Sequence, residues 1–240
     1  MARGLGLLDA FDGVETELTL TELAARTGLS KPTVHRLLGQ LVAWGGVERV
    51  RSGYRLGARL FQLGLQTPRH RALRETALPY LEELYEVTRE NVHLTVLSGH
   101  SVLCVEKVCG HRTMQIRPGI GSRLPAHSTA SGKLLLALLS PERVQQIIAG
   151  GLERLTPRTI VAPRLLWEEL ARTRARGYGL NREESQVGIA AVSAPVFDGS
   201  GTALAAMSVA GSVHRVDAHR LVPQLLEAAR AVSETLARLV

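Results

Sequence analysis

Residues 18–57 read LTLTELAARTGLSKPTVHRLLGQLVAWGGVERVRSGYRLG and decide the fold of the first third of the chain. Thr19 or Thr21 can cap a short helix, and a Gly-containing turn at residues 27–29 follows it. Ser30 starts a second helix, where its hydroxyl can accept a hydrogen bond from a first-turn amide. Apolar residues then recur at helical spacing. Two helices joined in this way predict a helix-turn-helix.

A basic hairpin follows the second helix directly. Residues 47–57 alternate apolar and polar side chains about Ser52-Gly53, which predicts two short antiparallel strands. Arg49, Arg51 and Arg55 lie on or beside these strands. A helix-turn-helix followed at once by a basic hairpin is typical of a winged helix, and the pair is much more specific than either part.

The positive charge of the chain is concentrated in this region. The 240 residues carry a net charge of +7, whereas residues 26–74 alone hold ten Lys and Arg against Glu48, a net charge of +9. A local patch of this kind indicates an anionic partner such as nucleic acid. On charge alone, a solvated arginine-rich surface remains the alternative.

The second helix is placed to read DNA, because a recognition helix presents its N-terminal residues to the base edges of the major groove. Whether Arg36 contacts a guanine edge or a phosphate stays open. The candidate DNA-binding residues at the helix start and on the hairpin are Ser30, Lys31, Thr33, His35, Arg36, Arg49, Arg51 and Arg55.

The remaining two thirds predict an antiparallel sheet with flanking helices, and the chain as a whole an α+β protein. Besides a first helix at 3–12, helices are expected at 57–67, ending near Pro68, and at 72–89, 141–149, 163–175 and 217–239. Strands are expected at 92–97, 102–108, 114–117, 178–182, 189–197 and 202–210.

A possible anion site lies between the two groups of strands. The stretch PGIGSRLPAHSTASGKLLLALL (118–139) joins a Gly- and Pro-rich loop to a helix that begins near residues 128–131, beside Lys133. Free amides at a helix start suit a carboxylate or phosphate. A simply capped loop is the alternative. Glu183 and Glu184 are expected to be surface or loop charges.

Enzyme signatures are missing from the sequence. The chain has no GxSxG or HExxH, and the glycines before Lys133 do not have phosphate-loop spacing. His93, His111 and His127 are too far apart to predict a metal site. Cys104 and Cys109 are expected to be small buried side chains. We therefore expect no catalytic residue, metal or cofactor.

Composition supports a globular chain with room for two modest domains. Hydrophobic residues make up 45% and charged residues 21%. The sequence has no uncharged apolar run long enough to predict a membrane span. Near the N-terminus, acidic residues stand where a secretory signal needs apolar ones. The cytoplasm is the expected compartment, with no membrane partner.

Several stretches of the chain carry a family resemblance. They are RGLGLLDAF (3–11), residues 18–50, YRLGARLFQLG (54–64), PAHSTASGKLLLALL (125–139), GIAAVSAPVFDGSGTALAAMSVAG (188–211) and the closing helix. Together they resemble the IclR family of bacterial transcriptional regulators. The resemblance implies a homodimer or dimer of dimers on a near-palindromic DNA operator. It also implies a winged helix-turn-helix domain at 1–66, a linker helix at 67–89 and a GAF-like effector-binding domain at 90–240.

The family's effector pocket maps onto a defined set of positions. Members that bind small oxo-acids often have an acid where Asn181 stands and a cysteine where Ala191 stands, so this pocket is less polar. A larger or more apolar effector, such as an aromatic or acyl acid, is therefore expected. The resemblance implies effector contacts at Ala130, Ser131, Asn181, Ile189, Ala191, Ser208 and Ala210.

These observations predict a one-component regulator that binds operator DNA and responds to a small metabolite, with activation and repression both open. The alternative is an enzyme or metabolite carrier that uses the same pocket, while the basic N-terminal face binds anions without specificity.

Overall fold

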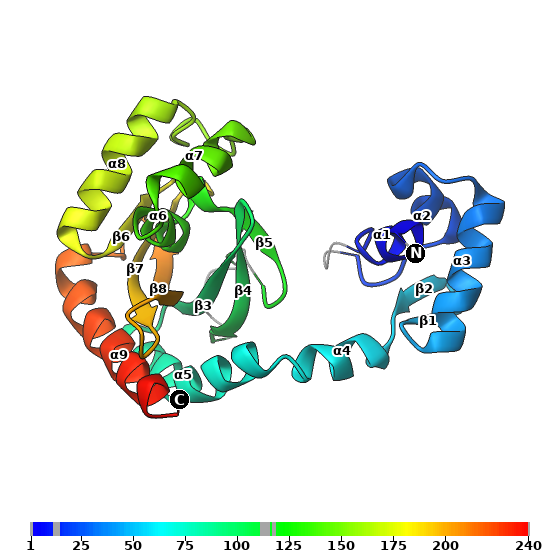
Figure 1. The fold of residues 1–240 in the computed structure, drawn as a ribbon, viewed down its shortest axis with the longest axis horizontal. Coiled ribbons are helices and arrows are strands. Elements are labelled where there is room, and N and C mark those ends of the chain that lie inside the picture. Colours follow the sequence, from blue (N-terminus) through cyan, green and yellow to red (C-terminus); the bar gives the residue numbers. More distant parts are fainter. Residues whose placement is uncertain (1, 12–14, 111–115, 117–118, 240) are drawn as a thin grey trace. The chain divides into compact units, whose positions relative to one another are not determined.

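The computed structural model describes residues 2–11, 15–110, 116 and 119–239. The chain forms two compact units, Met1–Arg71 and Ala72–Val240 (Figure 1). The predicted α+β class is confirmed. Of the strand expected at 114–117, only Ile116 is described. In the described parts of the chain, we find no helix with the length and apolarity needed to span a membrane.

The first unit is the predicted winged helix-turn-helix. Thr19 caps α2 by accepting from the Glu22 amide, and the Glu22 carboxylate accepts from the Thr19 amide in return. Gly28, at φ 68°, ends this helix. The elements are α1 (Ala2–Leu8), α2 (Leu20–Thr27), α3 (Lys31–Trp44), β1 (Val47–Val50), β2 (Gly53–Leu56) and α4 (Ala58–Leu65).

Ser30 differs from its prediction. It stands at the N-cap of α3, but its hydroxyl does not accept from a helix amide. The hydroxyl bonds instead to Thr33 Oγ1 at 2.9 Å. The two side chains therefore satisfy each other at the start of the helix.

The wing is tied to the chain that precedes α2. Leu18 and Tyr54 exchange two backbone hydrogen bonds, of 2.9 and 2.8 Å, which extends the β1–β2 hairpin by one more segment. Ser52 donates to the Glu17 carboxylate. A Cβ at Gly53 would overlap the Leu18 carbonyl group, so a glycine is needed for this close approach.

The second unit is built on one antiparallel sheet of six strands in the order β5-β4-β3-β8-β7-β6. Helix α5 joins the two units along the chain. Its bounds are Pro68–Thr88, so it begins four residues earlier than predicted, because proline is well tolerated at the first helical position. The other elements are β3 (Asn91–Ser98), β4 (Ser101–Val108), β5 (Arg123–Pro125), the 3₁₀ turn η1 (Ala126–Ser128), α6 (Ala130–Ala137), α7 (Pro141–Ala149), α8 (Pro163–Arg176), β6 (Gly179–Arg182), β7 (Ile189–Phe197), β8 (Ala203–Ser212) and α9 (Ala218–Arg238).

The two faces of this sheet differ in composition. One face packs Leu94, Val192, Met207 and similar side chains against α5 and α9. The residues between them face the other way, toward the layer of α6, α7 and α8 (Figure 1). On β3, β7 and β8 several of these are small or polar, including His93 and Ser208. Small side chains under a helix leave space for a pocket.

A buried ion pair holds α6 to the turn after β6. Lys133 is 1% exposed, and its Nζ lies 2.6 and 2.8 Å from the two carboxylate oxygens of Glu184. Burial raises the pKa of Glu184, and Lys133 offsets part of that shift. Burial also raises the pKa of Glu169, but Lys133, Arg176 and Arg172 outweigh it, so the net shift is downward. Glu184 thus lies in a loop, as predicted, but it is buried and is not a surface charge.

We expect Gly53→Ala to destabilise the first unit by about 2 kcal/mol, because the added Cβ must displace the backbone at Leu18. Gly39→Ala is the matched control, since a Cβ at Gly39 in α3 meets nothing within 4 Å. That change should stabilise the helix by up to ~1 kcal/mol. Thermal unfolding of the two variants measures both effects, and equal melting temperatures would contradict the assignment of this contact.

Lys133→Met should cost about 3–5 kcal/mol, because it leaves the buried Glu184 carboxylate without its cation. Chemical denaturation measures the loss. Arg172→Met is the control: Arg172 pairs with Glu169 in the same cluster, but its side chain is 62% exposed, so only a small effect is expected.

The double variant Lys133→Met/Glu184→Gln should regain part of the stability, because no unpaired carboxylate remains. A Lys133→Met variant as stable as Arg172→Met would show that this ion pair does not hold α6.

Candidate functional site

The start of α3 presents a polar, exposed surface. Ser30, Lys31, His35 and Arg36 are exposed, and Thr33 is half-buried. The opposite side of the helix is buried through Val34 and Leu38, which fixes the orientation of the exposed side. The structure therefore brings the five residues predicted on this helix to one end of it.

The wing carries the other three predicted residues, and they are not equivalent. Arg49 and Arg51 are exposed. Arg55 is also exposed, but its Nε and Nη2 donate to the Glu48 carboxylate at 2.9 and 2.8 Å. The hydrogen bond from Arg55 holds the pKa of Glu48 below its usual value. Arg49 and Arg51 are thus better placed than Arg55 to meet an external anion.

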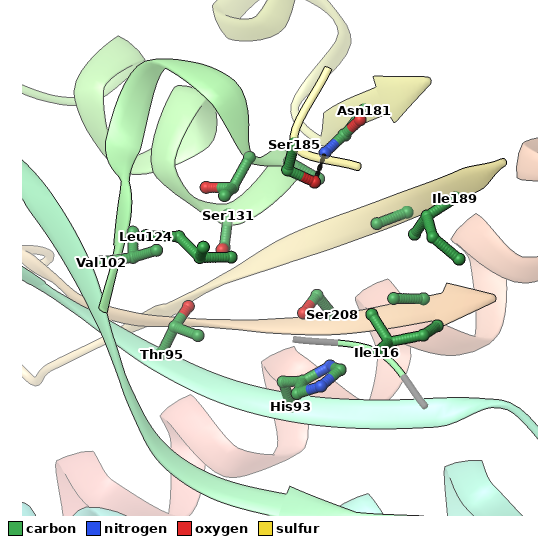
Figure 2. A pocket seen from close by; sticks show the side chains of 14 residues that line it. His93, Thr95, Val102, Ile116, Leu124, Ser131, Asn181, Ser185, Ile189 and Ser208 are labelled. Atoms are coloured by element: carbon green, nitrogen blue, oxygen red, sulfur yellow. Dashed lines mark hydrogen bonds between the residues drawn. The ribbon is translucent and has the colours of Figure 1, made fainter. Parts of the chain in front are cut away.

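The second unit holds a pocket between the sheet and the start of α6 (Figure 2). Its cavity volume, measured as the space that the centre of a water molecule can occupy, is about 40 Å³. A single water needs roughly 10–15 Å³ by this measure, so the pocket has room for a small molecule. The lining residues are His93, Thr95, Val102, Ile116, Leu124, Thr129, Ala130, Ser131, Asn181, Ser185, Ile189, Ala191, Ser208 and Ala210.

All seven predicted effector residues are among these fourteen, and none of the fourteen is charged. The seven come from α6, β6, β7 and β8, which are far apart along the chain. The sequence prediction missed the contribution of β3. His93 and Thr95 stand opposite Ser208 and Ala206 across the β3–β8 ladder, so strand alternation was the signal that could have found them.

The first turn of α6 forms one wall of the pocket. Thr129 caps the helix by accepting from the Gly132 amide at 2.9 Å. The preceding amides, of Ala130 and Ser131, have no acceptor within the helix, as in every helix start. Such amides and the helix dipole stabilise an anionic group. Lys133 takes no part, contrary to the expectation that it stands beside the anion, because it is committed to Glu184.

Two glycines allow α6 to start this close to its neighbours. A Cβ at Gly132 would overlap the Ala126 carbonyl, and one at Gly179 would overlap the Ala130 carbonyl. Both contacts involve backbone atoms, which cannot move aside as a flexible side chain can. The position of the helix start therefore depends on these residues.

Asn181 lines the pocket but uses its polar atoms within the protein. Its Nδ2 donates to the Ser128 carbonyl at 2.9 Å and to Ser185 Oγ at 2.8 Å, and its Oδ1 accepts from the Glu184 amide at 3.0 Å. Asn181 thus fixes the turn after β6, which brings Ser185 into the pocket wall.

The other singled-out residues do not form a metal centre in the described parts of the chain. His127 is buried, and its Nε2 bonds to the Glu153 carbonyl at 2.9 Å. His111 lies outside the described residues. Cys104 is buried as predicted, and burial raises its pKa to about 12. Cys109 is exposed, so the prediction of a buried side chain was wrong there.

Comparison with known proteins places the chain in a family. Residues 1–51 match the IclR helix-turn-helix domain, and residues 66–238 match the bacterial transcriptional regulator IclR C-terminal region. The regulator XynR of Escherichia coli is 34% identical over 98% of this chain and 95% of its own. The regulator BhcR of Paracoccus denitrificans is 37% identical over 96% of this chain and 85% of its own.

A solved structure is similar in fold to this chain over its whole length. An IclR homologue from Microbacterium hydrocarbonoxydans, complexed with 4-hydroxybenzoate, superposes with a TM-score of 0.90 at 30% identity. The match covers 100% of this chain and 99% of the other. With its winged helix-turn-helix and its pocketed second unit, the chain belongs to the IclR family of bacterial transcriptional regulators.

Proposed function

We propose that the exposed start of α3 and the wing together bind double-stranded operator DNA. In this proposal α3 enters the major groove, where Thr33, His35 and Arg36 meet base edges. Ser30 and Lys31 contact phosphates. The wing arginines Arg49, Arg51 and Arg55 contact the adjoining backbone, Arg55 least because of its bond to Glu48.

The proposed effector is a small organic or aromatic acid bound in the pocket under α6. Its carboxylate lies at the amides of Ala130 and Ser131, and its body packs on Ile189, Ala191 and the neighbouring strand residues. The observation that carries this proposal is the convergence of all seven predicted residues on one pocket without a charged lining residue. The 4-hydroxybenzoate bound by the Microbacterium homologue supports the aromatic class.

The proposed domains are residues 1–66 for DNA binding, 67–89 for the linker and 90–240 for effector binding. We place the regulator in the cytoplasm as a homodimer or dimer of dimers. The effector acts by binding one arrangement of the assembly better than the other, and tenfold better binding shifts the balance by about 1.4 kcal/mol. Repression and activation use the same parts.

An enzyme or metabolite carrier is the alternative. The relatives named above are transcriptional regulators, which favours regulation. The two functions differ in their outcome with ligand: a regulator returns the ligand unchanged and alters its DNA affinity, whereas an enzyme consumes it.

Arg36→Ala should reduce the preference for operator over random duplex, because Arg36 is proposed to reach bases. Arg51→Ala should weaken binding to every duplex and lower the salt slope by about one unit. Binding of the intergenic DNA beside the gene, measured over a range of salt concentrations, tests both. If Arg51→Ala altered base preference and Arg36→Ala did not, the two roles would be wrongly assigned.

A ligand acid at one hundred times its dissociation constant should stabilise the protein by about 2.7 kcal/mol, which a thermal-shift assay with 4-hydroxybenzoate detects. Ala191→Leu should abolish the shift, because the added side chain fills the pocket. Ala175→Leu, at an exposed position of α8, is the control and should leave it intact. An unchanged shift in Ala191→Leu would place the ligand elsewhere.

A further inference from the structure

His93 is a buried polar residue whose hydrogen bonding is incomplete. It lies on β3, is 2% exposed and lines the pocket. Its Nε2 has no hydrogen-bond partner among the described residues. A buried polar atom without a partner is destabilising, so such atoms are rare unless something outside the chain completes them.

Two other polar side chains of the pocket contrast with His93. Thr95 Oγ1 donates to the Ala206 carbonyl at 3.3 Å, and Asn181 is bonded through both its amide nitrogen and its oxygen. These side chains are satisfied without a ligand. His93 Nε2 is a buried atom of the pocket without a partner among the described residues, and a polar ligand group can supply one.

His93 is neutral in this environment. Burial lowers its pKa to about 3, and the nearby Lys107 ammonium adds to the effect. A neutral imidazole has one donor and one acceptor nitrogen, and either can be Nε2. A hydroxyl group matches both tautomers, because it donates and accepts. A carbonyl or an ammonium group matches only one.

The position of His93 sets which end of a ligand it meets. His93 and Ser208 face each other in register across the β3–β8 ladder, on the sheet side of the pocket. Ser131 lies on the other side of the pocket, at the start of α6 (Figure 2). A carboxylate held at the start of α6 thus leaves the rest of the molecule directed toward the sheet and His93.

We infer that His93 selects the effector by hydrogen-bonding a hydroxyl group at the end away from the carboxylate, so that the effector is a hydroxylated acid. The inference rests on the proposed function, since it takes the pocket under α6 as the effector site. It names a specificity residue that the sequence prediction did not include among the effector contacts.

The test compares two acids that differ by one hydroxyl group, 4-hydroxybenzoate and benzoate, by calorimetry on the full chain. The wild-type protein should bind 4-hydroxybenzoate about tenfold more tightly, as expected for one net hydrogen bond. His93→Phe should remove this preference while leaving benzoate affinity unchanged or improved. His93→Gln, which keeps a donor and an acceptor, should retain part of the preference.

Ser193→Ala is the matched control. Ser193 Oγ is also buried without a partner among the described residues, and Ser193 pairs with Ser208 in the sheet, but it does not line the pocket. Its removal should leave the affinities for both acids unchanged. The melting temperature of ligand-free His93→Phe should equal or exceed that of the wild type.

Four results would overturn the inference. Equal binding of both acids by the wild type, or equal weakening of both by His93→Phe, would exclude the selective role of His93. Either result would leave the proposed function unaffected. A large fall in the melting temperature of ligand-free His93→Phe and of ligand-free His93→Gln would make His93 a structural residue. If the wild type binds neither these acids nor lactate and propionate, the proposed effector class fails, and the inference fails with it.

Discussion

The buried ion pair between Lys133 and Glu184 fixes the start of α6 against the turn after β6. Asn181 completes the attachment by holding the backbone of the same turn. Both the helix amides and Ser185 reach the pocket only while these two elements stay together. Because both charges are buried, loss of Lys133 leaves the Glu184 carboxylate without its cation. The pocket thus depends on an interaction that contributes no atom to its lining.

The sheet forms the other wall of the pocket, and its two faces have different roles. Large apolar side chains on alternate positions of β3, β7 and β8 pack against α5 and α9 and provide the core. The intervening positions carry residues such as Ala191, Ala210 and Ser208, which are too small to fill the space under α6. A single set of strands therefore both stabilises the unit and leaves room for a ligand.

The winged unit depends mainly on contacts that are close in sequence. The capping box at Thr19, the left-handed Gly28 and the apolar spacing of α3 each act within one or two helical turns. Because these signals are local, long-range contacts rarely override them. The helix-turn-helix and its hairpin can therefore be predicted from the amino-acid sequence. The pairing of Leu18 with Tyr54 joins distant segments, as does the hydrogen bond from Ser52 to Glu17, and it requires Gly53.

The sequence by itself determined the winged helix, the helices of the second unit and its strands other than β5, which lies in a predicted loop. Through family resemblance it also gave seven residues that line one pocket. The helices and strands could be predicted because helix caps, turns and periodicity are local. The tertiary structure alone decided that Glu184 is buried against Lys133, that Arg55 is occupied by Glu48, and that His93 faces the pocket. Charge does not reveal burial in advance, since a carboxylate such as Glu184 enters the interior only when a cation from a distant segment is brought beside it.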